Sequence, residues 1–162
     1  MKKTDFPFNN AGGLKQILAI PESSFLGVGF TQDCKRFLNL TKLDDIICIG
    51  LLPSDGGYQE NRQEDDGGDI YQIEISGFIY GKSENNDQII SELDAGTWIV
   101  ATEDADGNWI VSGSHRVRLV FERKKDTSTS RSGLKGTSFS FSCEDEYESV
   151  NIRPPMIKAF CS

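Results

Sequence analysis

The chain has 162 residues, the size of one domain that can bury a hydrophobic core. Its 37% hydrophobic and 26% charged residues are typical of a folded globular protein rather than a disordered one. The formal net charge is −8. This charge argues against a general nucleic-acid-binding protein and against docking on an anionic membrane, because both need a basic surface.

The start of the chain and its cysteines predict synthesis in a cytoplasm. The residues after Lys3 are mixed polar and aromatic, where a secretion signal would have a continuous apolar segment. The four cysteines, at positions 34, 48, 143 and 161, include no Cys-x-x-Cys pair, so a zinc site is not expected. We therefore expect reduced thiols.

The first third of the chain predicts an arm followed by strands. Residues 1–13 contain turn formers without an apolar period and predict an N-terminal arm. Residues 14–20 and 25–30 predict strands, and the apolar run 46–52 predicts a buried strand. Residues 31–45 fit neither a helix nor a strand.

Residues 55–69 are acidic and rich in glycine, with six carboxylates against Arg62 as the one base. They lack an apolar period and predict a long loop, and loops of this length are usually functional or ordered by a partner. Residues 69–80 then predict the longest strand, in which Gly77 marks a bulge or a bend.

Residues 86–95 predict the one helix, because Ile89, Ile90 and Leu93 form an apolar stripe and Gly96 supplies a stop. The candidates for its N-cap are Asn85, Asn86 and Asp87. A helix this short is marginal alone in water, so we expect it to pack on a sheet.

Two patterns in the second half predict antiparallel sheet. Residues 97–103 and 108–113 predict strands joined by a turn that contains the pair Asp106-Gly107. Residues 137–143 alternate strictly between two faces, which predicts a strand with one face in a core. The buried face would carry Thr137, Phe139, Phe141 and Cys143.

These patterns together predict a mainly β fold, an antiparallel β-sandwich or barrel with one short flanking helix. The single domain would span residues 14–150. An extended C-terminal tail would follow over residues 151–162, because Pro154 and Pro155 disfavour helix.

The motifs that could carry chemistry are weak, and we expect neither an enzyme nor a bound cofactor. The weak metal candidates are Asp104, Asp106 and Asn108. Their alternate spacing resembles the start of an EF-hand loop, but Trp109 and His115 stand where that loop needs glycine and glutamate, so a hairpin turn is favoured. His115 is the only imidazole, and no Gly-x-Ser-x-Gly motif accompanies it.

Two alternatives stay open at this point. Trp98 and Trp109 could form an exposed sugar-stacking platform, which with a calcium ion at the turn would make a carbohydrate-binding β-sandwich, although core positions are favoured. A weaker hypothesis is a hydrolase that uses the clustered carboxylates of Asp65 and Asp66.

Charge is distributed in blocks along the chain. Residues 55–69 and 144–148 are acidic, and residues 122–136 are basic. The blocks are either solvated loops or complementary patches that meet between neighbouring copies in a head-to-tail ring.

The order of several segments resembles small virion proteins of tailed phages that infect Bacteroides-like bacteria. These segments are residues 10–21, the strand at 68–71, the helix that leads into a strand, the hairpin at 106–113 and the strand at 136–142. The resemblance implies a tail-tube or head–tail connector subunit, without enzymatic activity or cofactor, that assembles into rings through loops and terminal arms.

The resemblance also implies a location and partners. The protein would be made in the bacterial host cytoplasm and reside in the virion, as a homo-oligomeric ring in contact with other virion proteins. It would bind no membrane and no specific nucleic acid, and its negative charge would suit the wall of a DNA conduit, because a like-charged wall does not trap phosphates. The implied interface candidates are Asp65, Asp66, Asp69, Arg123, Lys124, Lys125, Arg131, Pro154 and Pro155.

Overall fold

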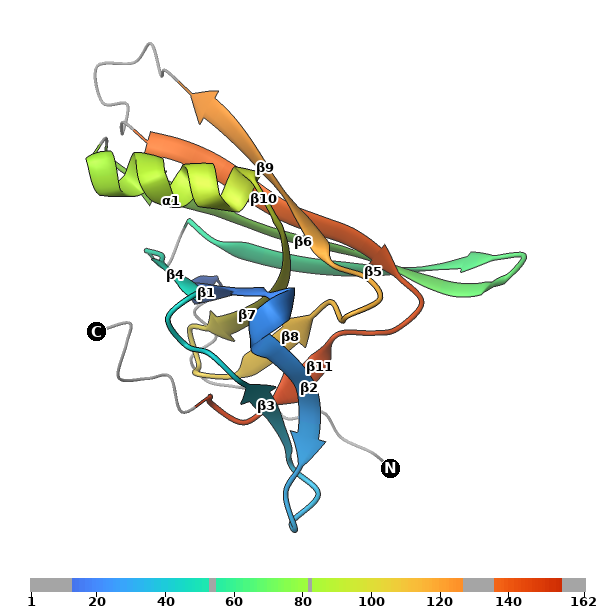
Figure 1. Ribbon diagram of the computed structural model, residues 1–162. Coiled ribbons are helices and arrows are strands. Elements are labelled where there is room, and N and C mark those ends of the chain that lie inside the picture. The colour runs from blue at the N-terminus through green and yellow to red at the C-terminus, as the bar shows by residue number, and fades with distance from the viewer. Residues whose placement is uncertain (1–12, 53–54, 82, 127–135, 156–162) are drawn as a thin grey trace.

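The computed structural model describes residues 13–52, 55–81, 83–126 and 136–155 (Figure 1). Its elements in chain order are β1 (Leu14–Pro21), the 3-10 helix η1 (Glu22–Ser24), β2 (Phe25–Phe30), β3 (Arg36–Leu40), β4 (Ile47–Gly50), β5 (Gly57–Asp65), β6 (Gly68–Tyr80), α1 (Glu84–Asp94), β7 (Thr97–Asp104), β8 (Trp109–Ser112), β9 (Leu119–Asp126), β10 (Gly136–Asp145) and β11 (Val150–Ile152). The predicted class, mainly β with antiparallel strands and one short α-helix, is confirmed.

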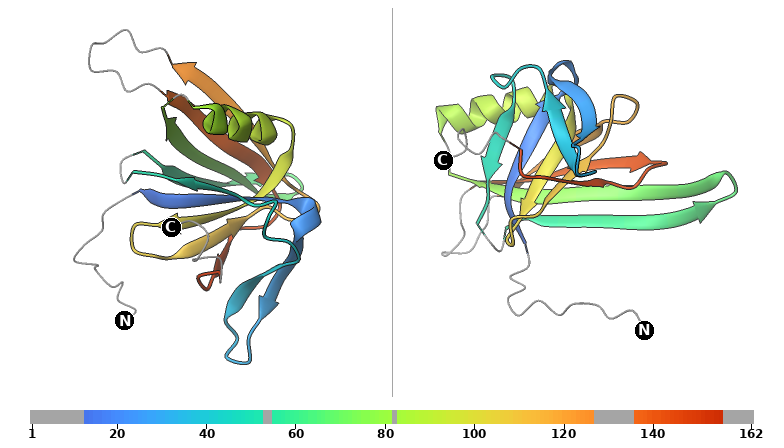
Figure 2. Two further views of the ribbon diagram at one scale, coloured as in Figure 1. Left: turned by 60° about the vertical axis from the view of Figure 1, so that its left-hand side comes forward. Right: turned by 90° about the horizontal axis from the view of Figure 1, so that it is seen from below.

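The nine-stranded sheet folds into two halves that meet at β7. One edge of β7 pairs with β1, which in turn pairs with β4. The other edge pairs first with β9, at Thr97 and Trp98, and then with β8, from Val100 to Glu103. The first half is therefore β4-β1-β7-β8-β11 and the second is β9-β10-β6-β5, a sandwich-like arrangement (Figure 2).

The main core lies between these halves and under the helix. It takes residues from β1, β4 and β7 of the first half and from β6, β9 and β10 of the second. Phe121, Phe139 and Phe141 contact one another with ring centroids 5.2–5.7 Å apart. The predicted alternation of residues 137–143 is confirmed, since Thr137, Phe139 and Phe141 are buried on one face.

A second core covers the outer face of the first half. Leu18 of β1 and Ile99 of β7 point into it, beside Trp109 of β8, and the two-stranded β2–β3 sheet covers them. Because both faces of β1, β4 and β7 are packed, these strands read as nearly continuous apolar runs. Residues 31–45, which fitted no pattern, contain β3 and the turns on either side of it.

The helix packs on the main core through Ile90 and Leu93. Its N-cap is Ser83, whose hydroxyl oxygen accepts a hydrogen bond from the backbone N–H of Asn86 at 3.1 Å, so the cap predicted at residues 85–87 was wrong. At the other end the Trp98 indole donates to the carbonyl of Leu93 at 3.0 Å. No helix in the described ranges is long and apolar enough to cross a membrane.

Two further expectations are corrected by the structure. Residues 57–65 are a strand rather than loop, and with β6 they form one long hairpin that turns at Asp66 and Gly67. Gly77 marks no bulge, because the β6–β10 register runs without a shift from Tyr80 to Tyr71. A Cβ at Gly77 would instead lie 2.6 Å from the Phe139 ring, so glycine is needed there for close packing.

The prediction of reduced thiols was wrong at one position. Cys48 is disulfide-bonded, whereas Cys34 and Cys143 are free. Cys48 lies in β4 and packs against the second core. A free cysteine is also common at such an apolar position, so the sequence pattern could not show that Cys48 is disulfide-bonded.

Candidate functional site

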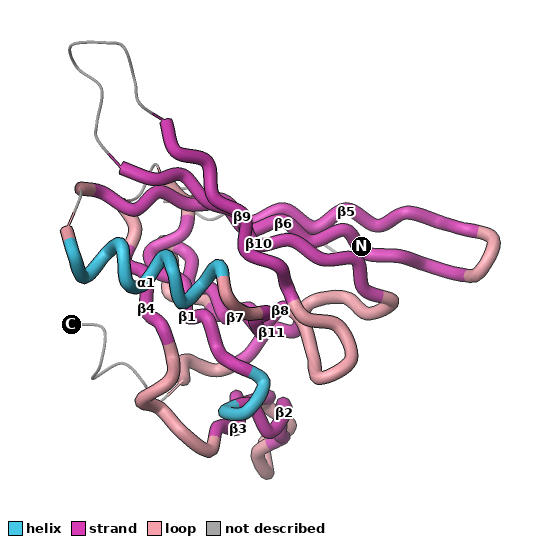
Figure 3. Tube along the Cα trace, turned by 45° about the horizontal axis from the view of Figure 1, so that its top comes forward, coloured by secondary structure: helices cyan, strands magenta, loops and turns pink. Residues whose placement is uncertain are grey.

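The outer end of the β5–β6 hairpin projects from the body of the protein. We call residues 61–70 the arm. Residues 61–68 are all exposed, and the β6–β10 pairing ends at Tyr71, so among the described strands no third one pairs with the arm (Figure 3). An isolated two-stranded hairpin is marginally stable in water, so contact with another surface would stabilise the arm.

The arm is held in shape by polar contacts between its own strands. The Arg62 guanidinium lies 2.9 Å from the Asp69 carboxylate across the hairpin and 3.6 Å from that of Glu64. The side-chain amides of Gln63 and Gln72 donate to each other at 3.2 and 3.3 Å. These contacts leave Asp65 and Asp66 at the tip, so the arm ends in negative charge.

The basic residues predicted as interface candidates lie on β9. Arg123, Lys124 and Lys125 occupy the part of this strand just before its last residue, Asp126, and we call them the basic end of β9. The Arg123 guanidinium lies 2.9 Å from the Asp94 carboxylate at the end of α1. Arg131 lies outside the described residues.

The arm and the basic end of β9 occupy diagonally opposite corners of the β9-β10-β6-β5 half. The ladders place Asp126 opposite Gly136 and Gly136 opposite Tyr80, so the end of β9 is level with the end of β6. The arm begins at the other end of β6, past Tyr71, and on the far edge of the half-sheet (Figure 1). The backbone of the basic end therefore lies far from the arm within one chain.

The proline candidates differ in exposure. Pro154 is exposed, but Pro155 is buried against its own chain. Residues 150–152 just before them form β11, which pairs with β8. Of the two, only Pro154 is exposed to solvent.

A polar cluster at the root of the arm escaped the sequence analysis. The Glu60 carboxylate accepts a hydrogen bond from the Tyr58 hydroxyl and another from the backbone N–H of Ser149, both at 2.9 Å. The hydroxyls of Ser149 and Ser112 are 2.9 Å apart. Burial raises the pKa of Tyr58 to about 12. The cluster joins three distant segments, and no local pattern marks such residues.

The weak calcium candidates form a closed turn. The Asp104 carboxylate accepts hydrogen bonds from the backbone N–H groups of Asp106 and Asn108 at 2.9 and 2.8 Å, and from the Asn108 amide at 2.8 Å. The favoured hairpin turn is confirmed. Within the described ranges, no three histidine, cysteine, aspartate or glutamate side chains converge as a metal site would require.

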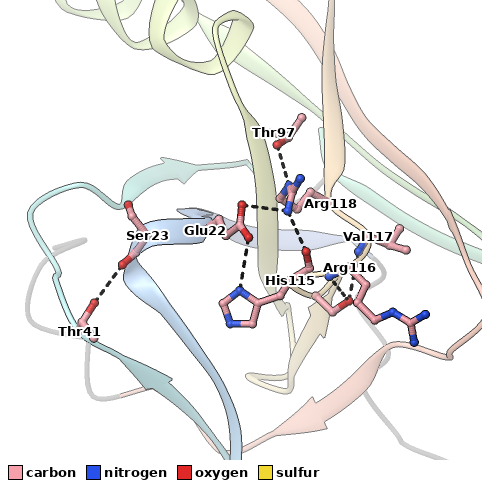
Figure 4. A network of polar contacts seen from close by, with 9 residues as sticks. Glu22, Ser23, Thr41, Thr97, His115, Arg116, Val117 and Arg118 are labelled. Atoms are coloured by element: carbon pink, nitrogen blue, oxygen red, sulfur yellow. Dashed lines mark hydrogen bonds and ion pairs between the residues drawn. The ribbon is translucent and has the colours of Figure 1, made fainter.

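His115 belongs to a surface network that ties η1 to the loop before β9 (Figure 4). Its Nδ1 lies 3.7 Å from a Glu22 oxygen, and the Arg118 guanidinium lies 2.9 Å from the other oxygen. Arg118 also donates to the His115 carbonyl at 2.8 Å and to the Thr97 hydroxyl at 3.1 Å. Glu22, His115 and Arg118 thus each contact another residue of the network. The Ser114 hydroxyl accepts hydrogen bonds from the backbone N–H groups of its own turn.

The two tryptophans lie in the cores rather than on a platform. Trp98 is 6% exposed in the main core and Trp109 is 2% exposed in the second core. They point to opposite faces of the sheet, so the carbohydrate hypothesis loses its stacking surface. The carboxylates of Asp65 and Asp66, proposed for a hydrolase, stand at the exposed tip of the arm.

Comparison of the chain with protein-family models, curated proteins and solved structures gives no match.

Proposed function

We propose that the chain is a non-enzymatic virion structural protein, a ring-forming subunit of a phage tail or head–tail connector. The observation that carries this proposal is the placement of opposite charges at opposite corners of one molecule. The acidic arm of one copy can reach the basic end of β9 on the next copy, whereas it cannot reach its own.

Such a contact is heterologous, because two different surfaces meet. Heterologous contacts repeat head to tail and close into a ring when the rotation allows it. Two copies of the arm placed against each other would instead bring like charges together, with Glu64, Asp65 and Asp66 on both sides. Charge therefore disfavours a two-fold dimer through the arm and favours the head-to-tail contact.

The remaining properties fit a virion component. A net charge of −8 suits a wall that DNA passes without being trapped. A disulfide at Cys48 suits a protein that ends on a particle outside the reducing cytoplasm in which it is made. Partners would be further copies and other virion proteins.

The test is a charge exchange measured by native mass spectrometry. Reversing the arm with Glu64→Lys, Asp65→Lys and Asp66→Lys should break the ring and leave monomer at low protein concentration. Reversing the basic end with Lys124→Glu and Lys125→Glu should do the same. Mixing the two variants in equal amounts should restore contacts between unlike copies, because each arm then faces a matched partner.

A matched control reverses three exposed carboxylates elsewhere, with Asp44→Lys, Asp45→Lys and Glu92→Lys. This control should keep the wild-type mass. Equal loss of mass in the control and the arm variant would show a general effect of net charge, and would overturn the proposal. An arm variant with unchanged mass would overturn it as well.

A further inference from the structure

The β2–β3 hairpin exposes an unusual amount of apolar surface. Phe30 is 66% exposed and Leu26 is 56% exposed, and Phe37 on the opposite strand is partly exposed. The inner residues Val28, Leu38 and Leu40 pack on the second core, but the end of the hairpin extends beyond it (Figures 1 and 3). Clustered exposed aromatic and aliphatic side chains mark interaction sites.

The tip of this hairpin combines an aromatic ring with positive charge. We call residues 30–37 the tip. The Arg36 guanidinium carbon lies 5.8 Å from the centroid of the Phe30 ring, and Lys35 precedes it. The one carboxylate of the tip, Asp33, lies 3.4 Å from the Arg153 guanidinium. The tip therefore presents a phenyl group beside two cations.

A groove of about 510 Å³ lies at the base of the same hairpin. Val28, Val111 and Val150 supply apolar lining, and Tyr147, itself 64% exposed, stands at the edge. This volume is inside the range of about 300–1,000 Å³ that is typical of binding sites.

Part of the groove's border belongs to the acidic block at 144–148. Glu148 is exposed and lines the groove, and the exposed Glu144 and Glu146 line the hollow next to it. His115 and Arg116 also line the groove. The carboxylate of Asp145 is buried and accepts a hydrogen bond from the backbone N–H of Tyr147 at 3.1 Å, which holds the loop in place. The groove thus offers an apolar floor with Glu148 and Arg116 at its border and two further exposed glutamates beside it.

The tip and the groove are complementary in polarity and charge. Val28 and Phe30 lie on the same face of the extended strand β2, but only Val28 lines the groove; Phe30 lies further along the strand and is 66% exposed. We propose that the tip of one copy docks in the groove of a second copy, with Phe30 on the apolar floor and Lys35 and Arg36 against the glutamates.

This contact is also heterologous, but it uses none of the residues of the arm or of the basic end of β9. It gives the subunit a second direction of growth, in which copies add tip to groove and the series stays open unless the rotation closes it. The contact therefore stands or fails independently of the ring.

The test measures self-association by sedimentation velocity in the arm variant Glu64→Lys, Asp65→Lys, Asp66→Lys, which lacks the arm contact. The proposal predicts that association persists in this background at high concentration. Adding Phe30→Ser should weaken it by about tenfold or more, as expected when a buried aromatic anchor is lost. Adding Leu43→Ser, which removes an exposed apolar side chain outside the hairpin, should leave it unchanged.

A charge exchange identifies the groove. Lys35→Glu with Arg36→Glu should weaken association, and Glu146→Lys with Glu148→Lys should do so too, whereas an equal mixture of the two variants should associate again. The proposal is overturned if the arm variant without further substitutions stays monomeric at every concentration. Equal effects of Phe30→Ser and Leu43→Ser would overturn it.

The exposed thiol of Cys34 at the tip gives a second readout. In Glu148→Cys, a bis-maleimide should join the tip of one copy to the rim of another and produce a ladder of covalent oligomers. The ladder should disappear when Cys34→Ser is added. A ladder that survives Cys34→Ser, or no ladder at all, would contradict a tip-to-groove contact.

Discussion

The carboxylate of Glu60 accepts a hydrogen bond from the backbone N–H of Ser149 at 2.9 Å, across 89 residues of sequence. The same oxygen accepts from the Tyr58 hydroxyl. This contact fastens β5, where the arm begins, to the loop that leads into β11. The direction in which the arm leaves the body therefore depends on Glu60.

Removing this acceptor should destabilise the protein. Glu60→Ala leaves the Ser149 N–H and the Tyr58 hydroxyl without their partner, and we expect a loss of about 1–2 kcal/mol in the free energy of unfolding. Glu60→Gln keeps a carbonyl oxygen as acceptor and should lose clearly less. Urea unfolding measures both, and equal stability of Glu60→Ala and wild type would contradict the role assigned to this side chain.

Gly77 should tolerate no side chain, because a Cβ there would meet the Phe139 ring at 2.6 Å. Gly77→Ala is expected to cost about 1–3 kcal/mol, the usual cost of overpacking. Gly67→Ala is the matched control, since a Cβ at Gly67 meets nothing within 4 Å, and it should change stability by less than about 0.5 kcal/mol. A Gly77→Ala protein as stable as the control would refute the packing argument.

Stability should fall in alkaline solution. Burial raises the pKa of Tyr58 from 10.0 to about 12, and burial followed by the Asp145 carboxylate raises the pKa of Cys143 from 9.0 to about 11. The unfolded chain releases these protons at lower pH than the folded protein, so the stabilisation is complete below about pH 9 and is lost as pH rises toward about 12.

Denaturant unfolding midpoints at about pH 9 and about pH 11 test this dependence. Tyr58→Phe should flatten it, because one of the groups whose pKa is raised is gone. Tyr147→Phe, which changes an exposed tyrosine, should not. The prediction fails if both variants lose stability with pH as steeply as wild type.

The two free thiols should differ in reactivity. Cys34 is exposed at the hairpin tip, whereas Cys143 is partly buried and has a raised pKa, so little of its reactive thiolate is present at neutral pH. We expect iodoacetamide to modify Cys34 at least about tenfold faster, as measured by peptide mass spectrometry. In urea the difference should vanish, and equal rates in the native protein would contradict the burial of Cys143.

The sequence predicted those strands in which apolar and polar residues alternate, because one face of the strand is buried and the other is not. Phe139 and Phe141 mark their strand because the opposite positions are serines. The hairpin between β7 and β8 was equally clear, since the Asp104 side chain and Gly107 mark the turn. In both places, residues close together in the sequence were enough to predict the structure.

The arm was missed for a physical reason. Beyond Tyr71 both faces of β5 and β6 meet water, so neither face selects apolar residues and the period of two is absent. The strand is specified by its partner and by polar pairs such as Arg62 with Asp69, which are visible only once the register is known. Polar character was mistaken for loop character.

The candidate site was predictable in composition but not in geometry. The acidic and basic blocks were evident as charge runs, and their placement at opposite corners depended on the strand order. The groove beneath the β2–β3 hairpin brings Val28, Val111 and Val150 together from three segments, none of which carries a motif.

The most direct test of the account is the native mass of the wild-type chain, measured by mass photometry over a wide range of concentrations with negative-stain imaging of the largest species. The head-to-tail contact predicts one closed oligomer of fixed subunit number at low concentration, which appears as a rotationally symmetric ring and persists on dilution. A protein that keeps the mass of one 18.0 kDa chain at every concentration would contradict it.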